Sequence, residues 1–268
     1  MASIVHARKL QAIGVQLYTV RSILPEKPAE TLRALDAMGY REVEGNIADL
    51  PKIVAGLNGL HMKLVSLHMD IPLILKGKDE DLSRAFAETK KAGASYAVFP
   101  YLPPANRGGL DAIRLLAESL NRAGEKCRAE GLKFCYHNHA FEFEPIQGTT
   151  PLEVMMNNTD KKAVGLELDA FWVSVAGHDP VEMINKYAGR VHLMHLKDKA
   201  EGTPVMYKES PGKAAFKEIG NGVLDWAKVL RAASAAGVEH YFVEQDQTPG
   251  DPLDSLRQSI QYLKKLDY

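Results

Sequence analysis

The strongest constraint on the fold is a strand-like segment followed by a helix-like segment, repeated eight times along 268 residues. The strand-like segments are short and rich in β-branched or aromatic residues, and cover 13–18, 40–45, 64–68, 96–101, 133–139, 163–169, 191–198 and 241–245. The intervening segments carry apolar residues at helical spacing, and cover 28–39, 49–60, 79–93, 109–130, 151–158, 179–189, 223–237 and 252–266. Eight such units predict an α/β fold, a single (β/α)8 TIM barrel.

Chain length and loop composition support one barrel over the alternative, an open doubly wound sheet. A TIM barrel typically needs about 250 residues, and no composition shift or linker divides the chain, so residues 1–268 are predicted to form one domain. A doubly wound nucleotide-binding sheet usually carries a glycine-rich turn after its first strand. Here that turn reads YTVRSILPEKP, and the sequence contains neither G-x-G-x-x-G nor a P-loop. Nucleotide binding therefore has little support.

Charge and cysteine content narrow the class of partner. Lys and Arg number 33 and Asp and Glu 34, which leaves no basic surplus for nucleic acid or anionic lipid. Cys127 and Cys135 fit neither a disulfide framework nor a paired-cysteine zinc site, which favours a reducing compartment. No apolar run reaches the roughly 18 residues of a membrane span, and residues 1–11 lack the apolar core of a signal peptide. We expect a cytoplasmic protein without nucleic-acid or membrane partners; a removed export signal and a homo-oligomer stay open.

Four segments near consecutive strand ends finish in side chains that bind metal ions. Glu142 closes YHNHAFE, Asp169 closes GLELD, His195 closes VHLMH and Glu244 closes HYFVE. Active sites of TIM barrels lie at the carboxyl ends of the strands, so these side chains are predicted to converge on one divalent ion. Three carboxylates and an imidazole suit Mn²⁺, Mg²⁺ or Co²⁺, with Zn²⁺ as a further option. Each residue alone could simply cap a helix, but four on consecutive strands argue against that interpretation.

Strand alternation selects one of two histidines in VHLMH. His195 shares its side of the strand with Leu193 and Val191, whereas His192 should face the helical layer. His195 is therefore the predicted ligand.

Three further histidines are candidates for proton transfer or substrate contact. His68 ends the third strand, and His137 and His139 share a side of the fifth segment. A neutral imidazole near pH 7 is suited to general base catalysis, so His137 and His139 are catalytic candidates and His68 a substrate-binding candidate. The competing interpretation is a buried histidine bonded to a backbone carbonyl.

Other side chains near the predicted mouth could contact a sugar. Lys197 follows His195 by two residues and could orient a substrate oxygen, although a solvated lysine is the simpler alternative. Tyr18 and Trp172 could form an apolar wall for a sugar ring, although aromatic residues near strand ends often belong to the rim of the core.

Several motifs, taken in order, resemble a known family. IGVQLYTVR, YHNHAFEF, GLELDAFWV, HLMHLKD, EIGNGVLDW and VEQD are similar to segments of the sugar phosphate isomerase/epimerase family with a xylose isomerase-like TIM barrel. The resemblance runs from about residue 12 to the C-terminus. It is specific to the superfamily and poorly specific to the substrate.

The resemblance implies one divalent ion, commonly Mn²⁺, held by Glu142, Asp169, His195 and Glu244. In ketose 3-epimerases of this superfamily, the two glutamates also exchange protons with the substrate carbon. In inosose dehydratase-like members and keto-sugar lyases, a similar site removes a proton next to a carbonyl and eliminates a β-substituent. Because elimination needs a base on one side and an acid for the departing oxygen on the other, a neutral histidine is then the expected base. We expect an enzyme acting on a small carbohydrate or cyclitol, an isomerase or epimerase first and a lyase second. A non-catalytic sugar-binding barrel is the remote alternative.

Trp172 separates the chain from a related class of barrel. Endonuclease IV shares the fold but needs three zinc ions and a histidine three residues after the aspartate ligand. Here Trp172 stands at that position, and no basic surplus is present. These two features argue strongly against the nuclease interpretation. Ketose epimerases also tend to carry this histidine, which keeps the lyase alternative close.

Overall fold

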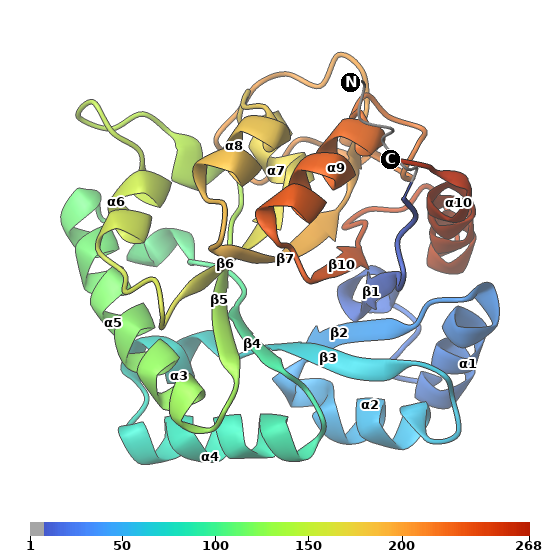
Figure 1. The fold of residues 1–268 in the computed structure, drawn as a ribbon, viewed down its shortest axis with the longest axis horizontal. Coiled ribbons are helices and arrows are strands. Elements are labelled where there is room, and N and C mark those ends of the chain that lie inside the picture. Colours follow the sequence, from blue (N-terminus) through green and yellow to red (C-terminus); the bar gives the residue numbers. More distant parts are fainter. Residues whose placement is uncertain (1–7) are drawn as a thin grey trace, which may run out of the picture.

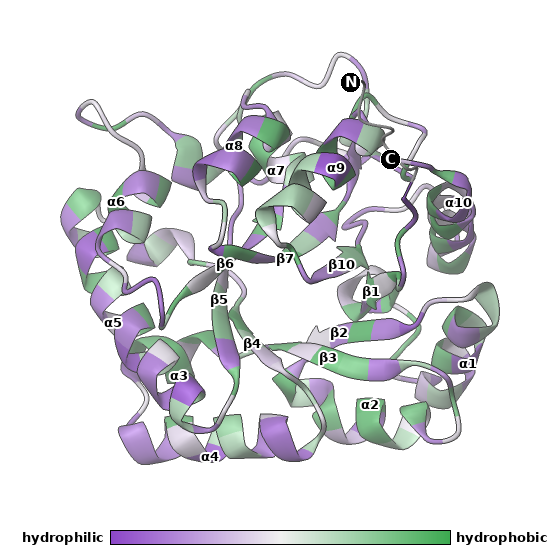
Figure 2. Cartoon of the chain, in the orientation of Figure 1, coloured by the Kyte–Doolittle hydropathy of each residue, from purple (hydrophilic) through white to green (hydrophobic). Residues whose placement is uncertain are grey.

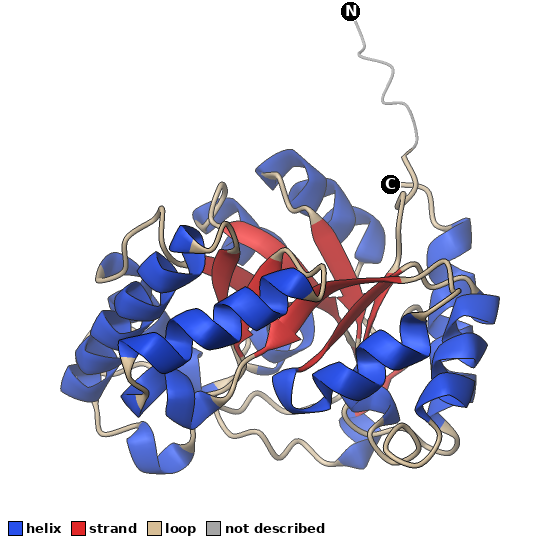
Figure 3. Cartoon of the chain, turned by 90° about the horizontal axis from the view of Figure 1, so that it is seen from below, coloured by secondary structure: helices blue, strands red, loops and turns tan. Residues whose placement is uncertain are grey.

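The computed structural model describes residues 8–268, which form a closed barrel of eight parallel strands surrounded by helices (Figures 1 and 3). The order around the barrel is β1-β10-β7-β6-β5-β4-β3-β2, and β2 pairs with β1 to close it. The strands are β1 (Gly14–Gln16), β2 (Glu42–Asn46), β3 (Lys63–His68), β4 (Tyr96–Phe99), β5 (Lys133–His137), β6 (Gly165–Asp169), β7 (Val191–Leu196) and β10 (His240–Val243). The predicted TIM barrel is confirmed. The one-domain prediction also includes residues 1–7, which lie outside the described residues.

Helices cover the outside of the barrel, as the side view shows (Figure 3). They are α1 (Pro28–Met38), α2 (Leu50–Leu57), α3 (Ile71–Lys76), α4 (Asp79–Lys91), α5 (Leu110–Ala129), α6 (Pro151–Asn157), α7 (Ala170–Val175), α8 (Pro180–Lys186), α9 (Trp226–Ala236) and α10 (Pro252–Lys265). All eight predicted helices are present with slightly shorter bounds. The short helices α3 and α7 were not predicted, because each follows its strand almost directly and is too short for helical periodicity to show.

A small antiparallel pair lies outside the barrel, between β7 and α9. It consists of β8 (Asp198–Lys199) and β9 (Phe216–Lys217). The two strands close the loop 200–215, which runs beside the barrel mouth. Asp198 fixes the segment that follows, because its carboxylate accepts hydrogen bonds from the Gly220 nitrogen at 2.9 Å and the Trp226 indole at 2.8 Å.

The interior of the barrel is apolar deep inside and charged toward the carboxyl ends of the strands. A separate buried cluster of six side chains from five strands fills the deep part: Val65, Tyr96, Val98, Cys135, Leu193 and Phe242. Gly14 makes room for this packing, because a Cβ there would lie 2.4 Å from the Phe242 ring. Hydrophobic and hydrophilic residues alternate along the helices (Figure 2), and the buried apolar residues of the helices belong to the core around the barrel.

Strand alternation holds at β7. Leu193 belongs to the interior cluster and His195, two residues on, is fully buried among acidic side chains. His192 lies on the other side of the strand, with its Nδ1 3.3 Å from the Glu239 carboxylate. Cys127 and Cys135 are buried free thiols. Within residues 8–268, no helix has the length and apolar character needed to cross a membrane.

Candidate functional site

Four neighbouring strands deliver one buried side chain each to the mouth of the barrel. His137 ends β5, Asp169 ends β6, His195 is the fifth of six residues in β7, and Glu244 directly follows β10. One nitrogen or oxygen from each lies within 4.8 Å of the others. We call these four residues the outer group. It contains three of the four predicted ligands, with His137 as the fourth member.

The donor atoms of the outer group fit a divalent ion. Metal–ligand bonds of roughly 2.0–2.2 Å allow donors on opposite sides of an ion to lie about 4.4 Å apart. The observed separations, up to 4.8 Å, therefore need to shrink by only a few tenths of an ångström. Asp169 Oδ1 caps α7 by accepting from the Trp172 nitrogen at 3.0 Å, while Oδ2 is left for the Lys197 ammonium, 3.1 Å away, and for an ion. The helix cap and the candidate ligand are thus two oxygens of one carboxylate.

Glu142 lies apart from the other predicted ligands. Its carboxylate accepts hydrogen bonds from the Tyr136 hydroxyl at 2.7 Å and the His139 backbone nitrogen at 2.9 Å. Burial raises the pKa of this carboxyl to about 8. The side chain stands on a 3-10 turn, Phe141–Phe143, beyond the end of β5, so strand alternation does not aim it into the barrel. The structure therefore does not bring Glu142 into the outer group, and its ligand role stays a prediction.

A second set of ionisable side chains lies deeper in the barrel. Glu44 on β2, His68 on β3 and Glu167 on β6 surround the same His195, and we call these four the inner group. His68 Nε2 is 3.2 Å from both Glu44 Oε1 and Glu167 Oε2. Burial disfavours a charged His68, but the two carboxylates outweigh it and raise its pKa to about 9.

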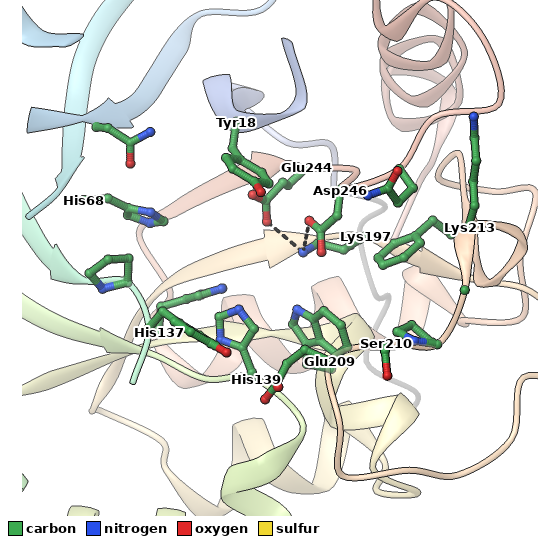
Figure 4. A pocket seen from close by; sticks show the side chains of 18 residues that line it. Tyr18, His68, His137, His139, Lys197, Glu209, Ser210, Lys213, Glu244 and Asp246 are labelled. Carbon is green, nitrogen blue, oxygen red and sulfur yellow. Dashed lines mark hydrogen bonds and ion pairs between the residues drawn. The ribbon is translucent and has the colours of Figure 1, made fainter. Parts of the chain in front are cut away.

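Lys197 places an ammonium group against the acidic side of the outer group (Figure 4). Its Nζ lies 3.1 Å from Asp169 Oδ2 and 2.8 Å from both Glu244 Oε2 and Asp246 Oδ1. Burial disfavours the charge, but the three carboxylates raise the pKa of Lys197 well above its usual value. Burial raises the pKa of Asp246 to about 6 despite the nearby ammonium. The predicted alternative of a solvated Lys197 is wrong, since its side chain is 1% exposed.

A cavity of about 720 Å³ opens above both groups. It is large enough for a sugar or cyclitol. All four predicted substrate contacts line it, together with both predicted catalytic histidines and Glu244: Tyr18, His68, Trp172, Lys197, His137, His139 and Glu244. The loop 200–215 adds Glu209, Ser210 and Lys213 to the wall (Figure 4). Glu142 is not among the lining residues.

Two residues of the cavity wall each have an enclosed side-chain nitrogen without a hydrogen-bond partner. His139 Nδ1 and Trp172 Nε1 are buried and make no hydrogen bond within the described part of the chain. The two rings lie side by side, with centroids 5.4 Å apart. Burial, reinforced by the positive charge of Lys197, lowers the pKa of His139 well below its usual value. His139 is therefore neutral near pH 7 and able to accept a proton.

Three site residues escaped the sequence analysis. Glu44 is the third of the five residues of β2 and lies on the same side of the strand as Glu42. This alternation was a sequence signal that could have identified it. Asp246 follows Glu244 by two residues in the motif VEQD, in which only Glu244 was considered as a site residue. Gln16 Nε2 donates a hydrogen bond to Glu44 Oε1 at 2.9 Å, and no local sequence pattern predicts this contact between two strands.

Comparison with known proteins identifies relatives of matching fold. An inosose dehydratase from Geobacillus thermodenitrificans is 30% identical over 161 residues, 56% of this chain and 53% of that protein. An inosose dehydratase from Clostridium perfringens is 28% identical over 162 residues, 57% of this chain and 54% of that protein. The matches thus span about half the length of these curated relatives.

Solved structures agree over nearly the whole chain. A sugar phosphate isomerase/epimerase from Parabacteroides distasonis superimposes with a TM-score of 0.78 at 22% identity, covering 95% of this chain and 98% of that one. The IOLI protein with a bound zinc atom gives a TM-score of 0.71 at 16% identity, covering 95% of both chains. At these identities the similarity shows the fold. The sequence model of the Xylose isomerase-like TIM barrel family matches residues 30–266. The chain therefore belongs to the xylose isomerase-like TIM barrel family.

Proposed function

We propose that this protein is a metal-dependent lyase of the dehydratase type, acting on a small keto-sugar or on a cyclitol ketone. The observation that carries the proposal is the arrangement around the cavity. A neutral histidine, His139, faces it from one side, while Lys197, Glu244 and Asp246 face it from the other (Figure 4). The two curated relatives, matched over about half of their length, are inosose dehydratases, an activity consistent with this chemistry.

The outer group would hold the ion. A bound divalent ion would polarise the substrate carbonyl and make the adjacent C–H more acidic. Zinc in the IOLI protein supports a divalent ion for this fold, and the two imidazoles and two carboxylates here accept Mn²⁺, Co²⁺ or Zn²⁺. We propose Mn²⁺ as the working ion.

His139 is the proposed general base. Elimination of water from a β-hydroxy ketone breaks a C–H bond next to the carbonyl and a C–O bond at the next carbon. The proton passes to a base, and the departing hydroxyl takes a proton from an acid. His139 is partly buried, neutral near pH 7, and lines the cavity. His137 belongs to the outer group, so we assign it to ion binding rather than to proton transfer.

The acid and the substrate contacts come from the opposite wall. The Lys197 ammonium stays charged near pH 7 and can stabilise negative charge that develops on the substrate oxygen. Burial raises the pKa of Asp246 to about 6, so its protonated fraction, which grows as the pH falls toward 6, can supply the proton to the departing hydroxyl. Trp172 and Tyr18 both line the cavity and can pack against a sugar ring, and Tyr18, which is 43% exposed, offers its aromatic face at the rim.

The isomerase or epimerase prediction is the second candidate, and Glu142 decides between the two. Glutamate-pair epimerisation needs Glu142 and Glu244 on either side of the reacting carbon. Only Glu244 lines the cavity, whereas both oxygens of Glu142 accept hydrogen bonds from protein groups, the Tyr136 hydroxyl and the His139 backbone nitrogen. This geometry favours the lyase.

The test is a screen of inososes, ketoses and 3-keto-glycosides with Mn²⁺, followed by NMR in D₂O. Loss of water or of an aglycone supports the lyase, and deuterium retained without elimination supports the epimerase. His139→Ala should slow the chemical step about 10²- to 10⁴-fold with metal retained. His61→Ala, at an exposed histidine 78% open to solvent, is the matched control. If Glu142→Gln instead abolishes proton exchange while metal is retained, the lyase assignment fails.

A further inference from the structure

We propose that Glu44 is the positioning residue that fixes which nitrogen of His195 is offered to the metal ion. Glu44 would accept the proton of His195 Nε2 and so leave the Nδ1 lone pair directed into the outer group. The inference rests on the proposed function to the extent that the outer group must bind a divalent ion. It adds a specific role for a residue that lies deeper than any ligand.

The two nitrogens of His195 face two different sets of carboxylates. Nδ1 lies 2.8 Å from Glu244 Oε2 and 3.8 Å from Asp169 Oδ2, both in the outer group. Nε2 lies 2.6 Å from Glu44 Oε1 and 3.5 Å from Glu167 Oε1, both in the inner group. The ring therefore bridges the two groups, with one nitrogen on each side.

A neutral imidazole carries one N–H and one lone pair, so one nitrogen can bind an ion only if the other holds the proton. Ligating histidines almost always donate that second N–H to a carboxylate, a carbonyl or water, which fixes the tautomer and the ring orientation. Glu44 Oε1 is the nearest acceptor to Nε2, at 2.6 Å. Its short distance makes it the partner that sets the tautomer.

Glu44 is itself held rigidly. Its side chain has no exposed surface, and Gln16 Nε2 on β1 donates to Oε1 at 2.9 Å. Gln16 is anchored in turn, because its own side-chain oxygen accepts from the Tyr18 backbone nitrogen at 3.0 Å. A chain of contacts thus runs from β1 through β2 to His195 on β7. Such support is what holds a ligand within the narrow geometry that metal binding needs.

His137 shows the same pattern more weakly. Its Nε2 lies 3.9 Å from Asp169 Oδ2, and its Nδ1 lies 3.5 Å from Glu167 Oε2. That second distance exceeds an ordinary hydrogen bond, and Nδ1 has no partner within residues 8–268. Glu167 is therefore the less effective positioning carboxylate, and its replacement should weaken metal binding less than replacement of Glu44.

The competing interpretation is a second ion in the inner group. Glu44 Oε2 and Glu167 Oε1 are buried without hydrogen bonds, as ligands of a missing ion would be. However, Glu44 Oε1 is already taken by the Gln16 amide and by His195, and neither glutamate reaches the cavity. A hydrogen-bonded inner group and one ion per chain fit these contacts better.

Calorimetric titration of the metal-free full-length protein with Mn²⁺ provides the first test. Glu44→Ala should raise the Kd for Mn²⁺ about 10- to 100-fold, the usual effect of removing such a partner. Glu44→Gln, which keeps an accepting oxygen without charge, should fall between Glu44→Ala and the wild type. The matched control is Glu42→Ala, which removes a buried carboxylate from the same strand, one that pairs with His240 at 2.8 Å instead. The Kd of Glu42→Ala should stay within about twofold of wild type, because Glu42 does not hydrogen-bond to a residue of the outer group.

The tautomer gives a second readout, which a purely structural role of Glu44 would not change. In the zinc-loaded protein with ¹⁵N-labelled histidine, NMR should show His195 Nδ1 bound to zinc and Nε2 protonated. Zinc on Nε2 would overturn the proposal, and so would an unchanged Kd in both Glu44 variants with normal thermal unfolding. Two ions per chain would replace it with the second-ion interpretation. A wild-type protein that binds no divalent ion would refute the proposed function and this inference together, whereas normal wild-type binding with unaffected Glu44 variants refutes this inference alone.

Discussion

Replacing Lys197 by methionine should destabilise the metal-free protein strongly. The ammonium lies within 3.1 Å of three carboxylates, those of the buried Asp169 and Glu244 and that of Asp246, whose side chain is 20% exposed. Methionine preserves the apolar stem but removes the charge that holds these acids together. Removing one partner of a buried ion pair typically costs about 3–5 kcal/mol, because it leaves uncompensated buried charge.

The expected loss translates into a measurable fall in melting temperature. An unfolding entropy of about 2.1 cal/mol/K per residue gives roughly 0.56 kcal/mol/K for a chain of 268 residues. The predicted destabilisation therefore lowers Tm by about 5–9 °C. Calorimetry of EDTA-treated protein at pH 7.5 measures this directly. Lys228→Met is the control, because Lys228 and Asp225 form an exposed pair, which is worth at most about 1 kcal/mol.

The pH dependence tests the cause. The folded-state pKa of Lys197 lies above its unfolded value of 10.5, so its stabilisation is fully present below that pH and lost as pH rises through the folded pKa. Without the ammonium, the three carboxylates repel one another unless they take up protons. The deficit of Lys197→Met should therefore shrink from pH 7.5 to pH 4.5.

Added Mn²⁺ should restore more stability to Lys197→Met than to the wild type, since a bound cation replaces the missing charge. A Tm within about 2 °C of wild type would refute the reasoning, because the predicted fall is about 5–9 °C. A deficit that grows on acidification would refute it as well.

Three further outcomes are expected. His137→Ala should weaken Mn²⁺ binding at least about tenfold in a calorimetric titration, because removing a ligand or its partner typically costs about 10–100-fold in affinity. Glu142→Gln should leave the Kd for Mn²⁺ within about threefold of wild type. The reverse ranking of the two variants would restore Glu142 as the ligand. Burial raises the pKa of Glu142 in the folded state to about 8, above its unfolded value of 4.5. Its contribution to the free energy of unfolding is therefore fully present below pH 4.5 and lost as pH rises through about 8. Glu142→Gln should flatten the resulting decline in Tm between about pH 6 and 9. Gly14→Ala should destabilise by about 1–3 kcal/mol in a denaturant titration, because its methyl group overlaps the Phe242 ring, whereas an unchanged unfolding midpoint would show that the ring can move aside.

Strand periodicity and alternation were sufficient to predict the barrel and much of the candidate site. The eight strand–helix units required a closed parallel barrel, and residues at the carboxyl ends of its strands necessarily meet at one mouth. That reasoning placed Asp169, His195 and Glu244 together, because each lies at the end of its strand or one residue from it. It also separated His195 from His192, since neighbours along a strand face opposite sides.

The tertiary structure decided what lies beyond the strand ends and what touches across the barrel. Glu142 follows a 3-10 turn after β5, where the alternation of a strand no longer governs direction, so proximity in sequence to His137 did not predict its place. Glu44, Gln16 and Asp246 acquire their roles only through partners 28 to 151 residues away or through a buried ammonium. Local sequence patterns encode the direction of a side chain relative to its own strand, whereas contacts between distant strands depend on barrel closure and register.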